Sequence, residues 1–375
     1  MIVKEQIAHF DKPLNLRCGK TFSNYDLVYE TYGTLNQQKN NAILICHALT
    51  GNHHAAGVYE NQSGNVGWWD ELIGEGKTID TNKFFVVCCS NLGTCFGSTS
   101  AESINPATNK IWGGDFPTLC VEDWVDSQKN LADFLGIDCW ATVIGGSLGG
   151  MQVISWALQY PQKVKNAIIL ASGAKLPVQH LAFSAVGRQA IMRDPYFNNG
   201  NYYQQQHQPD AGLAVARMMA HITYLCEEKM ESKFGHRRTK SAKSTKSTKA
   251  DFNANFEVEN YLTYQGQKFI NYYDANAYLL VSRATENFDP AKNYADNLSK
   301  LFALSSENTK FLVISFDSDW FFPPKVMLEL VKALLDNSRD VCYAEIDSDY
   351  GHDSFLLPIP HYMKVLRAFL DRIEI

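Results

Sequence analysis

The sequence of 375 residues predicts an α/β fold with a mostly parallel sheet and helices on both faces. Three observations support this prediction. Short apolar runs alternate along the chain with segments of helical composition, as is typical of α/β proteins. These runs are continuously apolar, which indicates strands that are covered on both faces. The alternation stops near residue 177 and resumes near residue 305, so the segment between these positions is predicted to be an insertion.

Six apolar runs are predicted to form the strands of this sheet. They span residues 42–46, 84–89, 141–144, 167–170, 311–314 and 341–346. Segments of helical composition that would cover the sheet span residues 121–135, 151–159, 326–335 and 361–373. Pro161 follows the second of these helices and would end it, because the residue before a proline disfavours helical geometry.

The middle of the chain, residues 177–304, shows little strand signal. Its helical stretches span residues 188–192, 212–230, 258–269 and 276–284. We expect a helical lid here, placed over the carboxyl ends of the strands, where open α/β sheets bind ligands. Residues 1–176 and 305–375 would then form the core domain.

A basic stretch lies within the predicted lid, at residues 237–249. It contains six Lys or Arg residues and no Asp or Glu. We interpret it as a disordered, solvated loop, because such a polar segment cannot gain order by burial. The alternative is an arm that binds the phosphates of a cosubstrate.

Composition narrows the possible functions. The net charge of −6 and a pI near 5.9 argue against nucleic acid as a partner. No apolar run approaches the roughly 20 residues of a membrane helix, and the first residues lack the apolar stretch of a signal peptide. The nine cysteines are an odd number, several lie in predicted strands, and no C-x-x-C pair occurs. We therefore expect a cytoplasmic protein without a zinc site.

The most informative motif is G-x-S-x-G, formed by Gly145, Ser147 and Gly149 between a predicted strand and a predicted helix. In this context the serine lies on a tight, strained turn, and the glycines avoid clashes that side chains would cause. The serine hydroxyl is then free to act as a nucleophile. The alternative is a glycine-rich turn without chemistry, which the flanking strand and helix make less favourable.

A nucleophilic serine needs a base and a carboxylate that orients the base. In α/β-hydrolases these follow the serine in the order Asp or Glu, then His. His352 follows the strand at 341–346, and Asp319 follows the strand at 311–314, so both leave carboxyl ends of strands. We predict a triad of Ser147, Asp319 and His352. Asp317 is the rival acid, and Asp347 and Asp349 are more remote candidates.

The oxyanion of an acyl-transfer reaction needs two backbone amides. The amide of Leu148, which follows the nucleophile, is predicted to supply one. The amide of Leu49, in the loop after the strand at 42–46, is predicted to supply the other. Three histidines in that region, His47, His53 and His54, could suggest a metal site. We expect no metal there, because no acidic or cysteine ligand stands at a suitable spacing.

The chain resembles the homoserine O-acetyltransferases of the MetX family. The segments that carry the resemblance are His47-Ala48-Leu49-Thr50-Gly51, Gly67-Trp68-Trp69-Asp70, Gly97-Ser98-Thr99, Ser103-Ile104-Asn105-Pro106, Gly145 to Gln152, Ala216 to Tyr224 and Tyr350-Gly351-His352-Asp353. They extend over nearly the whole chain. The resemblance implies an α/β-hydrolase core with a helical lid, usually in a homodimer. It also implies acetyl transfer from acetyl-CoA to the hydroxyl of L-homoserine, a step towards methionine, without a cofactor.

The resemblance also assigns roles by position. Ser147, Asp319 and His352 match the family's triad, and Arg217 and Asp353 match its substrate-binding residues. A cation for the carboxylate and an anion for the ammonium group suit an amino-acid acceptor. Taken alone, without the resemblance, Arg217 is better explained by a salt bridge on a helix. Tyr224 is expected to line the pocket, with an ordinary packed tyrosine as the alternative.

The chain departs from the family pattern in three places. Ser100 and Ala101 stand where the family usually has Gly-Pro, and the basic stretch at 237–249 is an insertion. Phe321 stands where succinyl-transferring relatives resemble one another in carrying arginine. Since phenylalanine cannot pair with a succinyl carboxylate, this position favours acetyl transfer.

Several alternatives stay open at this point. An esterase or thioesterase would use the same triad in a wetter pocket. A succinyl-transferring relative, or one that acylates serine, would share most of the same motifs, because serine and homoserine both carry an α-amino acid and a hydroxyl. A binding protein on the same fold would be indicated by a broken triad, and the sequence contains all three members.

Overall fold

The computed structural model describes residues 1–239 and 255–375. Its centre is an eight-stranded sheet with the strand order β17-β16-β15-β14-β6-β11-β5-β2. These strands are β2 (Gln6–Phe10), β5 (Tyr25–Tyr32), β6 (Ala42–Cys46), β11 (Phe85–Cys89), β14 (Thr142–Gly146), β15 (Asn166–Leu170), β16 (Lys310–Phe316) and β17 (Asp340–Ile346). The strands from β17 to β11 pair in parallel, whereas β5 and β2 pair antiparallel at one edge. The expected α/β fold is confirmed.

The described helices occupy two parts of the chain. Those beside the sheet are α1 (Val121–Leu135), α2 (Leu148–Gln159), α9 (Pro324–Asp336) and α10 (Pro360–Leu370). Those between β15 and β16 are α3 (Val178–Met192), α4 (Asp210–Tyr224), α5 (Glu227–Phe234), α6 (Glu257–Phe269), α7 (Ala275–Asn287) and α8 (Leu298–Phe302). Among the described residues, no helix is long and apolar enough to cross a membrane.

Short strands lie outside the main sheet. They are β1 (Ile2–Val3), β3 (Leu14–Asn15), β4 (Thr21–Phe22), β7 (Val58–Tyr59), β8 (Gln62–Val66), β9 (Ile73–Gly74), β10 (Ile79–Asp80), β12 (Ile104–Asn105) and β13 (Lys110–Ile111). The 3-10 helix η6 (Gly351–Leu356) follows β17 and carries His352.

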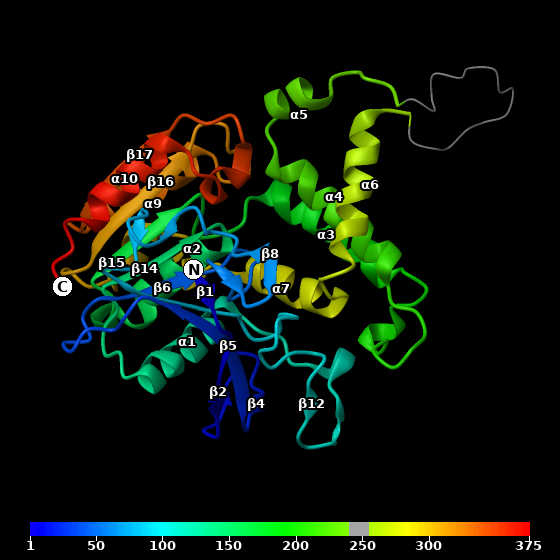
Figure 1. The fold of residues 1–375 in the computed structure, drawn as a ribbon, viewed down its shortest axis with the longest axis horizontal. Helices are drawn as coiled ribbons and strands as arrows, with labels where there is room; N and C mark the ends of the chain where they lie inside the picture. The colour runs from blue at the N-terminus through cyan, green and yellow to red at the C-terminus, as the bar shows by residue number, and fades with distance from the viewer. Residues whose placement is uncertain (240–254) are drawn as a thin grey trace, which may run out of the picture.

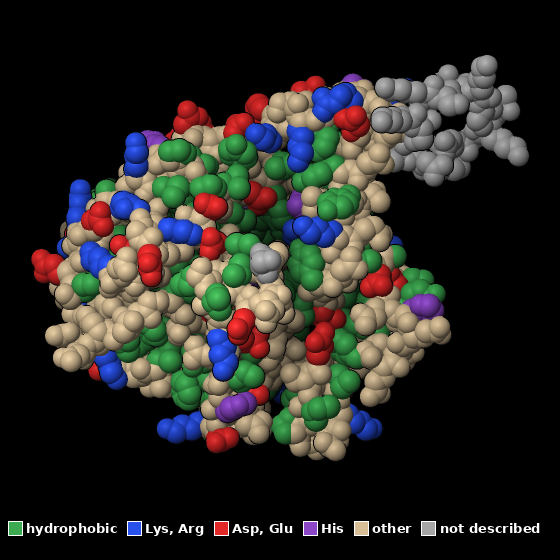
Figure 2. All heavy atoms as spheres, viewed as in Figure 1, with side chains coloured by type: hydrophobic (Ala, Val, Ile, Leu, Met, Phe, Trp, Pro, Cys, Tyr) green, Lys and Arg blue, Asp and Glu red, His purple; other side chains and the backbone are tan. Residues whose placement is uncertain are grey.

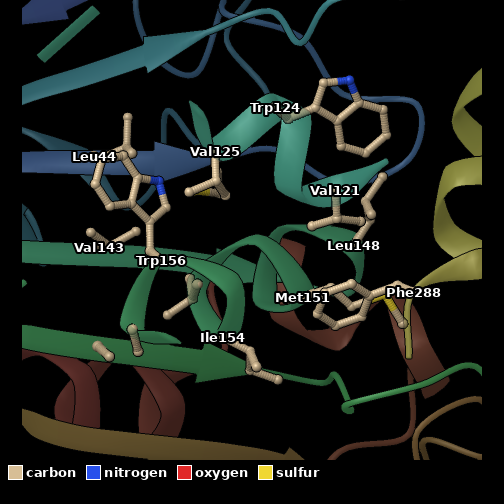
Figure 3. Close-up of a cluster of buried hydrophobic side chains, with 14 of the residues drawn as sticks. Leu44, Val121, Trp124, Val125, Val143, Leu148, Met151, Ile154, Trp156 and Phe288 are labelled. Atoms are coloured by element: carbon tan, nitrogen blue, oxygen red, sulfur yellow. The ribbon is translucent and has the colours of Figure 1, made fainter. Parts of the chain in front are cut away.

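The core on the α1 and α2 side of the sheet is densely apolar. Figure 3 shows Trp156 of α2 beside Val143 of β14 and Leu44 of β6, with Val125 of α1 facing them. The Trp156 side chain is fully buried, and its indole N–H donates to Gln128 at 2.7 Å, so burial leaves no unpaired donor there. This packing fixes α2, the helix that begins directly after Ser147.

The helices from α3 to α6 stand to one side of the sheet as a separate layer (Figure 1). They occupy the segment that we predicted to be a lid. The expected helix at 212–230 is wrong in one respect, because the structure divides it into α4 and α5. Leu225 adopts an extended conformation at the break, and its carbonyl accepts the indole N–H of Trp320 at 2.9 Å.

Other differences concern the ends of the chain. The antiparallel strands β2 and β5 were not among the predicted strands, and the last helix ends at Leu370 rather than at 373. Of the basic stretch, residues 240–249 lie outside the described residues. Arg237 is described, and its guanidinium pairs with Glu257 at 2.7 Å.

Candidate active site

Ser147 lies in a strained turn between β14 and α2. Its backbone has φ 56° and ψ −123°, a conformation that L-residues rarely adopt. The glycines of the motif make this turn possible. A Cβ atom at Gly149 would lie 2.1 Å from the carbonyl oxygen of Cys46, and one at Gly145 would lie 2.5 Å from the carbonyl of Gly149. Larger residues would therefore push the turn apart, which explains the spacing of the motif.

The structure brings the three predicted triad residues together. Nε2 of His352 lies 2.8 Å from the Oγ atom of Ser147, and Nδ1 of His352 lies 2.9 Å from the carboxylate of Asp319. His352 and Asp319 are almost completely buried, whereas Ser147 is half-buried. The residues come from the carboxyl ends of β14, β16 and β17, which meet at one edge of the parallel sheet. This geometry suits transfer of the serine proton to the imidazole.

The carboxylates of Asp319 and Asp317 have different environments. The second oxygen of Asp319 accepts the backbone amides of Phe321 and Phe322, at 2.8 and 3.0 Å. Asp317 is exposed, and its carboxylate instead accepts the amides of Ser318 and Ser348. Asp317 therefore organises the loops, and Asp319 contacts the histidine.

The two predicted oxyanion amides come from the start of α2 and from the turn after β6. Leu148 is the first residue of α2, so its amide has no acceptor within the helix. It lies at the N-terminus, which is the positive end of the helix dipole. Leu49 lies in a turn that the Gly51 amide closes onto the carbonyl of Ala48 at 3.0 Å. Within the described part of the chain, the Leu49 amide has no hydrogen-bond acceptor. Both amides can therefore serve a ligand oxygen.

His47 braces this turn from the core. Its Nε2 accepts the backbone amide of Asn91 at 3.1 Å, so its Nδ1 carries the proton and donates to the carbonyl of Ala48 at 2.8 Å. Burial lowers the pKa of His47 to about 4, in agreement with a neutral ring. The backbone carbonyl of His47 accepts from Gln152 of α2 at 3.1 Å. His47 thus fixes the peptide plane that contains the Leu49 amide.

The neighbouring histidines are also engaged by protein groups. Nδ1 of His54 lies 3.1 Å from the fully buried carboxylate of Glu30, and Nδ1 of His53 lies 2.8 Å from the hydroxyl of Ser90. Burial opposes ionisation of Glu30, but its hydrogen bonds with His54 and Tyr32 bring its pKa below the usual value. Over the described ranges, no group of three His, Cys, Asp or Glu residues could hold a metal ion.

Arg217 of α4 faces the site with unused hydrogen-bonding capacity. Its guanidinium lies 4.6 Å from the ring centroid of Phe269 and 5.7 Å from that of Tyr224. Nε and Nη1 are buried, and within the described residues neither has a hydrogen-bond partner. Buried guanidinium donors are normally paired, so this arrangement indicates a place for an anion.

Asp353 follows His352 in η6 and is partly buried. Burial raises the pKa of its carboxyl, and the charges of His352 and Arg217 act in the opposite direction. Across the described ranges, no ion pair within 4.0 Å joins Asp353 to Arg217. The two charges are thus near each other but separate. The ring centroid of Tyr224 lies 6.1 Å from that of His352, so the structure places Tyr224 beside the triad.

A pocket lies between the lid and the core, and Figure 2 shows the face hollowed between these two parts. Its lining combines lid side chains with Leu49, Leu176 and Phe321 from the core. The lid side includes His180, Phe183, Tyr224 and Tyr278. None of the described residues that line it is Lys or Arg. Phe321 lies between two histidines, with its ring 4.6 Å from His352 and 3.8 Å from His180, both nearly parallel.

Sequence reasoning missed two features of this site. His180 is buried, and burial lowers its pKa to about 4, so it is neutral against Phe321. A lone histidine in a helical segment gives no sign of this contact. Tyr273, which precedes α7, donates its hydroxyl to the carbonyl of Leu49 at 2.9 Å. The i, i+4 spacing of Phe269 and Tyr273 was the available signal, and it indicates ring packing but not the partner.

Comparisons with known proteins agree with this geometry. The family model for the alpha/beta hydrolase fold matches residues 41–358. A homoserine O-succinyltransferase from Azoarcus sp. is 53% identical over 373 residues, which cover 100% of this chain and 98% of that protein. A homoserine O-succinyltransferase from Pseudomonas fluorescens is 51% identical over 374 residues, covering 100% and 97%.

Two solved structures are similar over the whole chain. Homoserine O-acetyltransferase from Bacillus anthracis superposes with a TM-score of 0.90 at 29% identity, covering 100% of this chain and 99% of that one. Esterase E22 superposes with a TM-score of 0.87 at 28% identity, covering 98% and 100%. On the strength of this fold, this arrangement of Ser147, His352 and Asp319, and these relatives, the chain belongs to the α/β-hydrolase family and, within it, to the MetX family of homoserine O-acyltransferases.

Proposed function

We propose that this protein transfers an acyl group from an acyl-CoA thioester to the hydroxyl of L-homoserine. The observation that carries the proposal is the buried guanidinium of Arg217, which within the described residues leaves Nε and Nη1 without a partner, near the separate carboxylate of Asp353, the residue after His352. A free amino acid carries a carboxylate and an ammonium group that match these two charges. The names of the relatives support the same acceptor.

The reaction runs in two stages. Ser147 attacks the thioester carbonyl while His352 takes its proton, and the amides of Leu49 and Leu148 stabilise the oxyanion. The CoA thiolate leaves with the proton from His352. The homoserine hydroxyl then loses its proton to His352 and attacks the carbonyl of the acyl-enzyme. The bond between the acyl carbon and the Ser147 oxygen breaks, Ser147 takes the proton from His352, and the O-acyl product leaves.

We propose acetyl as the acyl group. A succinyl group ends in a carboxylate, and burying an unpaired carboxylate is costly. The ring of Phe321 lies against His352, and none of the described residues that line the pocket is Lys or Arg. The guanidinium of Arg217 lies 5.7 Å from the ring of Tyr224, and we assign it to the carboxylate of the acceptor. Succinyl transfer is the second candidate, because the curated relatives that are 50–53% identical are named succinyltransferases.

A thiol-release assay tests the proposal. Purified protein is given acetyl-CoA or succinyl-CoA with homoserine, serine or no acceptor. We expect fast CoA release with acetyl-CoA and homoserine, and little release without an acceptor. An esterase or thioesterase would instead release CoA at the same rate without homoserine, and faster turnover with succinyl-CoA would favour the second candidate. Ser147→Ala is the matched inactive control.

A further inference from the structure

The turn that carries Leu49 is held from two sides. From the core, His47 donates to the carbonyl of Ala48 at 2.8 Å and so holds the peptide that contains the Leu49 amide. From the lid, the hydroxyl of Tyr273 donates to the carbonyl of Leu49 at 2.9 Å. That carbonyl belongs to the central peptide of the turn, between Leu49 and Thr50, whereas the Leu49 amide belongs to the peptide before it, whose carbonyl also accepts the Gly51 amide. The bonds from His47 and Tyr273 therefore restrain the peptides on both sides of the Leu49 Cα atom.

Tyr273 is rigidly mounted in the lid. It is 5% exposed, and its ring stacks on Phe269 with centroids 4.7 Å apart and planes 15° from parallel. The next residue, Asp274, caps α7 through the amide of Ala277 at 2.9 Å. The same carboxylate accepts the hydroxyls of Tyr202 at 2.7 Å and Tyr203 at 3.0 Å. A tyrosine fixed in this way can hold its acceptor in one place.

The hydroxyl of Tyr273 remains a donor under all ordinary conditions. Burial raises its pKa well above the usual value, with Cys95 and Asp274 acting in the same direction. The ring beneath it, Phe269, lies 4.6 Å from the guanidinium of Arg217. The lid therefore connects the candidate anion site to the oxyanion turn through two packed rings.

We infer that Tyr273 is a positioning residue that anchors the Leu49 turn to the lid and so keeps Leu49, whose amide direction His47 sets, in place beside the developing oxyanion. The inference rests on the proposed function for the identity of the reaction. It adds that the lid contributes to the acylation of Ser147 and not to acceptor binding alone. Oxyanion donors stabilise the transition state most when they are fixed before the reaction.

Tyr273→Phe tests the inference, because it removes the hydroxyl and keeps the stacked ring. The acylation burst is measured with p-nitrophenyl acetate and with acetyl-CoA, and the KM for homoserine is measured separately. Removing an oxyanion donor costs roughly 100- to 1000-fold, so loosening one donor is expected to slow the burst about tenfold with both acyl donors. The KM for homoserine should stay nearly constant.

Tyr362→Phe is the matched control. This substitution also removes a buried tyrosine hydroxyl, but within the described residues that hydroxyl has no hydrogen-bond partner. Tyr362 lies in α10, which belongs to the core and not to the lid. Its burst should equal that of the wild type. Thermal unfolding midpoints of both variants show whether either change acts through stability.

The possible outcomes are distinct. An unchanged burst with a raised homoserine KM would mean that Tyr273 only shapes the acceptor site, and the inference would be wrong. A slowed burst in a variant whose unfolding midpoint has collapsed would also contradict it, because a general loss of structure would explain the result. The ester assay contains no homoserine. A wild-type protein that acylates with the ester but does not transfer to homoserine would therefore contradict the proposed function and leave the comparison of Tyr273 variants decisive.

Discussion

The environment of Asp319 determines what this carboxylate can do to His352. One oxygen faces Nδ1 of His352, and the other is held by the amides of Phe321 and Phe322. The carboxylate therefore cannot turn away, and it keeps the proton of the ring on Nδ1. His352 is then left with its unprotonated Nε2 facing Ser147, as a general base requires.

We predict that Asp319→Asn lowers kcat by about 10³- to 10⁴-fold, because an amide can stabilise the wrong tautomer of the histidine. Asp317→Asn is the control and should be nearly as active as the wild type. Its side-chain oxygen can still accept the amides of Ser318 and Ser348. Steady-state rates of thiol release provide the measurement, and the reverse ranking would show that the acid was assigned to the wrong residue.

Arg217 is expected to act in only one of the two stages. Arg217→Ala should raise the KM for homoserine about 10- to 100-fold, the equivalent of about 1.5–3 kcal/mol for hydrogen bonds to a charged group. The acylation burst should survive, because Arg217 is proposed to hold the acceptor carboxylate. Arg283→Ala, at a half-exposed lid arginine, should change neither quantity. Loss of the burst in Arg217→Ala would assign Arg217 to acyl-CoA binding or to lid structure.

At the scale of elements, the turn between β14 and α2 depends on close backbone contact. A Cβ atom at Gly149 would meet the carbonyl oxygen of Cys46, which is backbone and cannot move aside cheaply. We predict that Gly149→Ala abolishes activity and lowers the thermal unfolding midpoint. Gly64→Ala is the control, since a Cβ atom there meets no atom within 4 Å. A fully active Gly149→Ala variant would show that the turn tolerates a wider separation of α2 and β6.

The elements that sequence predicted well are those with strong local patterns. The continuous apolar runs predicted β6, β14 and β15 closely. These strands are buried on both faces, so nearly every residue in them is apolar and the run itself marks the strand. The edge strand β2 was missed, since only one of its five residues is buried and its pattern is mixed. The break between α4 and α5 depends on the contact of Leu225 with Trp320, almost 100 residues away, so no local pattern could show it.

The same distinction applies to the site. Ser147 carries its own local signature, and the order of residues in α/β-hydrolases indicated where to look for Asp319 and His352. The contact of Tyr273 with Leu49 spans more than 200 residues and depends on how the lid sits on the core. The stacking of His180 on Phe321 is likewise a tertiary contact. Such pairs follow from packing and not from sequence periodicity.

At the scale of the whole molecule, the lid and the core meet through polar contacts as well as apolar ones. The indole of Trp320 donates to Leu225, and the thiol of Cys226 lies 3.1 Å from the carbonyl of Asp349. A Cβ atom at Gly351, where φ is 66°, would lie 2.6 Å from the carbonyl of Tyr224. The loop that carries His352 is therefore pressed against the end of α4, and a change in the position of the lid must disturb the triad.

Burial of neutral histidines should make the stability of the folded chain sensitive to acid. The pKa is lowered from 6.5 to about 4 in His47 and His180, and to about 3 in His221, in each case chiefly by burial. The positive charges of Arg217 and Lys233 add to the effect at His221. At a pH between 6.5 and these lowered pKa values, the three histidines bind protons in the unfolded chain but not in the folded chain. The free energy of unfolding therefore falls as the pH falls below about 6.5, by at most about 1.4 kcal/mol per pH unit for each histidine.

Thermal unfolding midpoints at pH 7 and pH 5 test this expectation. Carboxyl groups whose pKa is raised by burial, such as Asp274, act in the opposite direction, so the comparison must be made between variants. His221→Gln removes one titrating group and should reduce the loss of stability between the two pH values relative to the wild type. His361→Gln, at an exposed position in α10, should leave that loss unchanged. The contrary outcome is that the unfolding midpoint of His221→Gln falls between pH 7 and pH 5 by as much as that of the wild type. His221 would then bind its proton equally well in the folded and unfolded chains, which would contradict its burial beside Arg217.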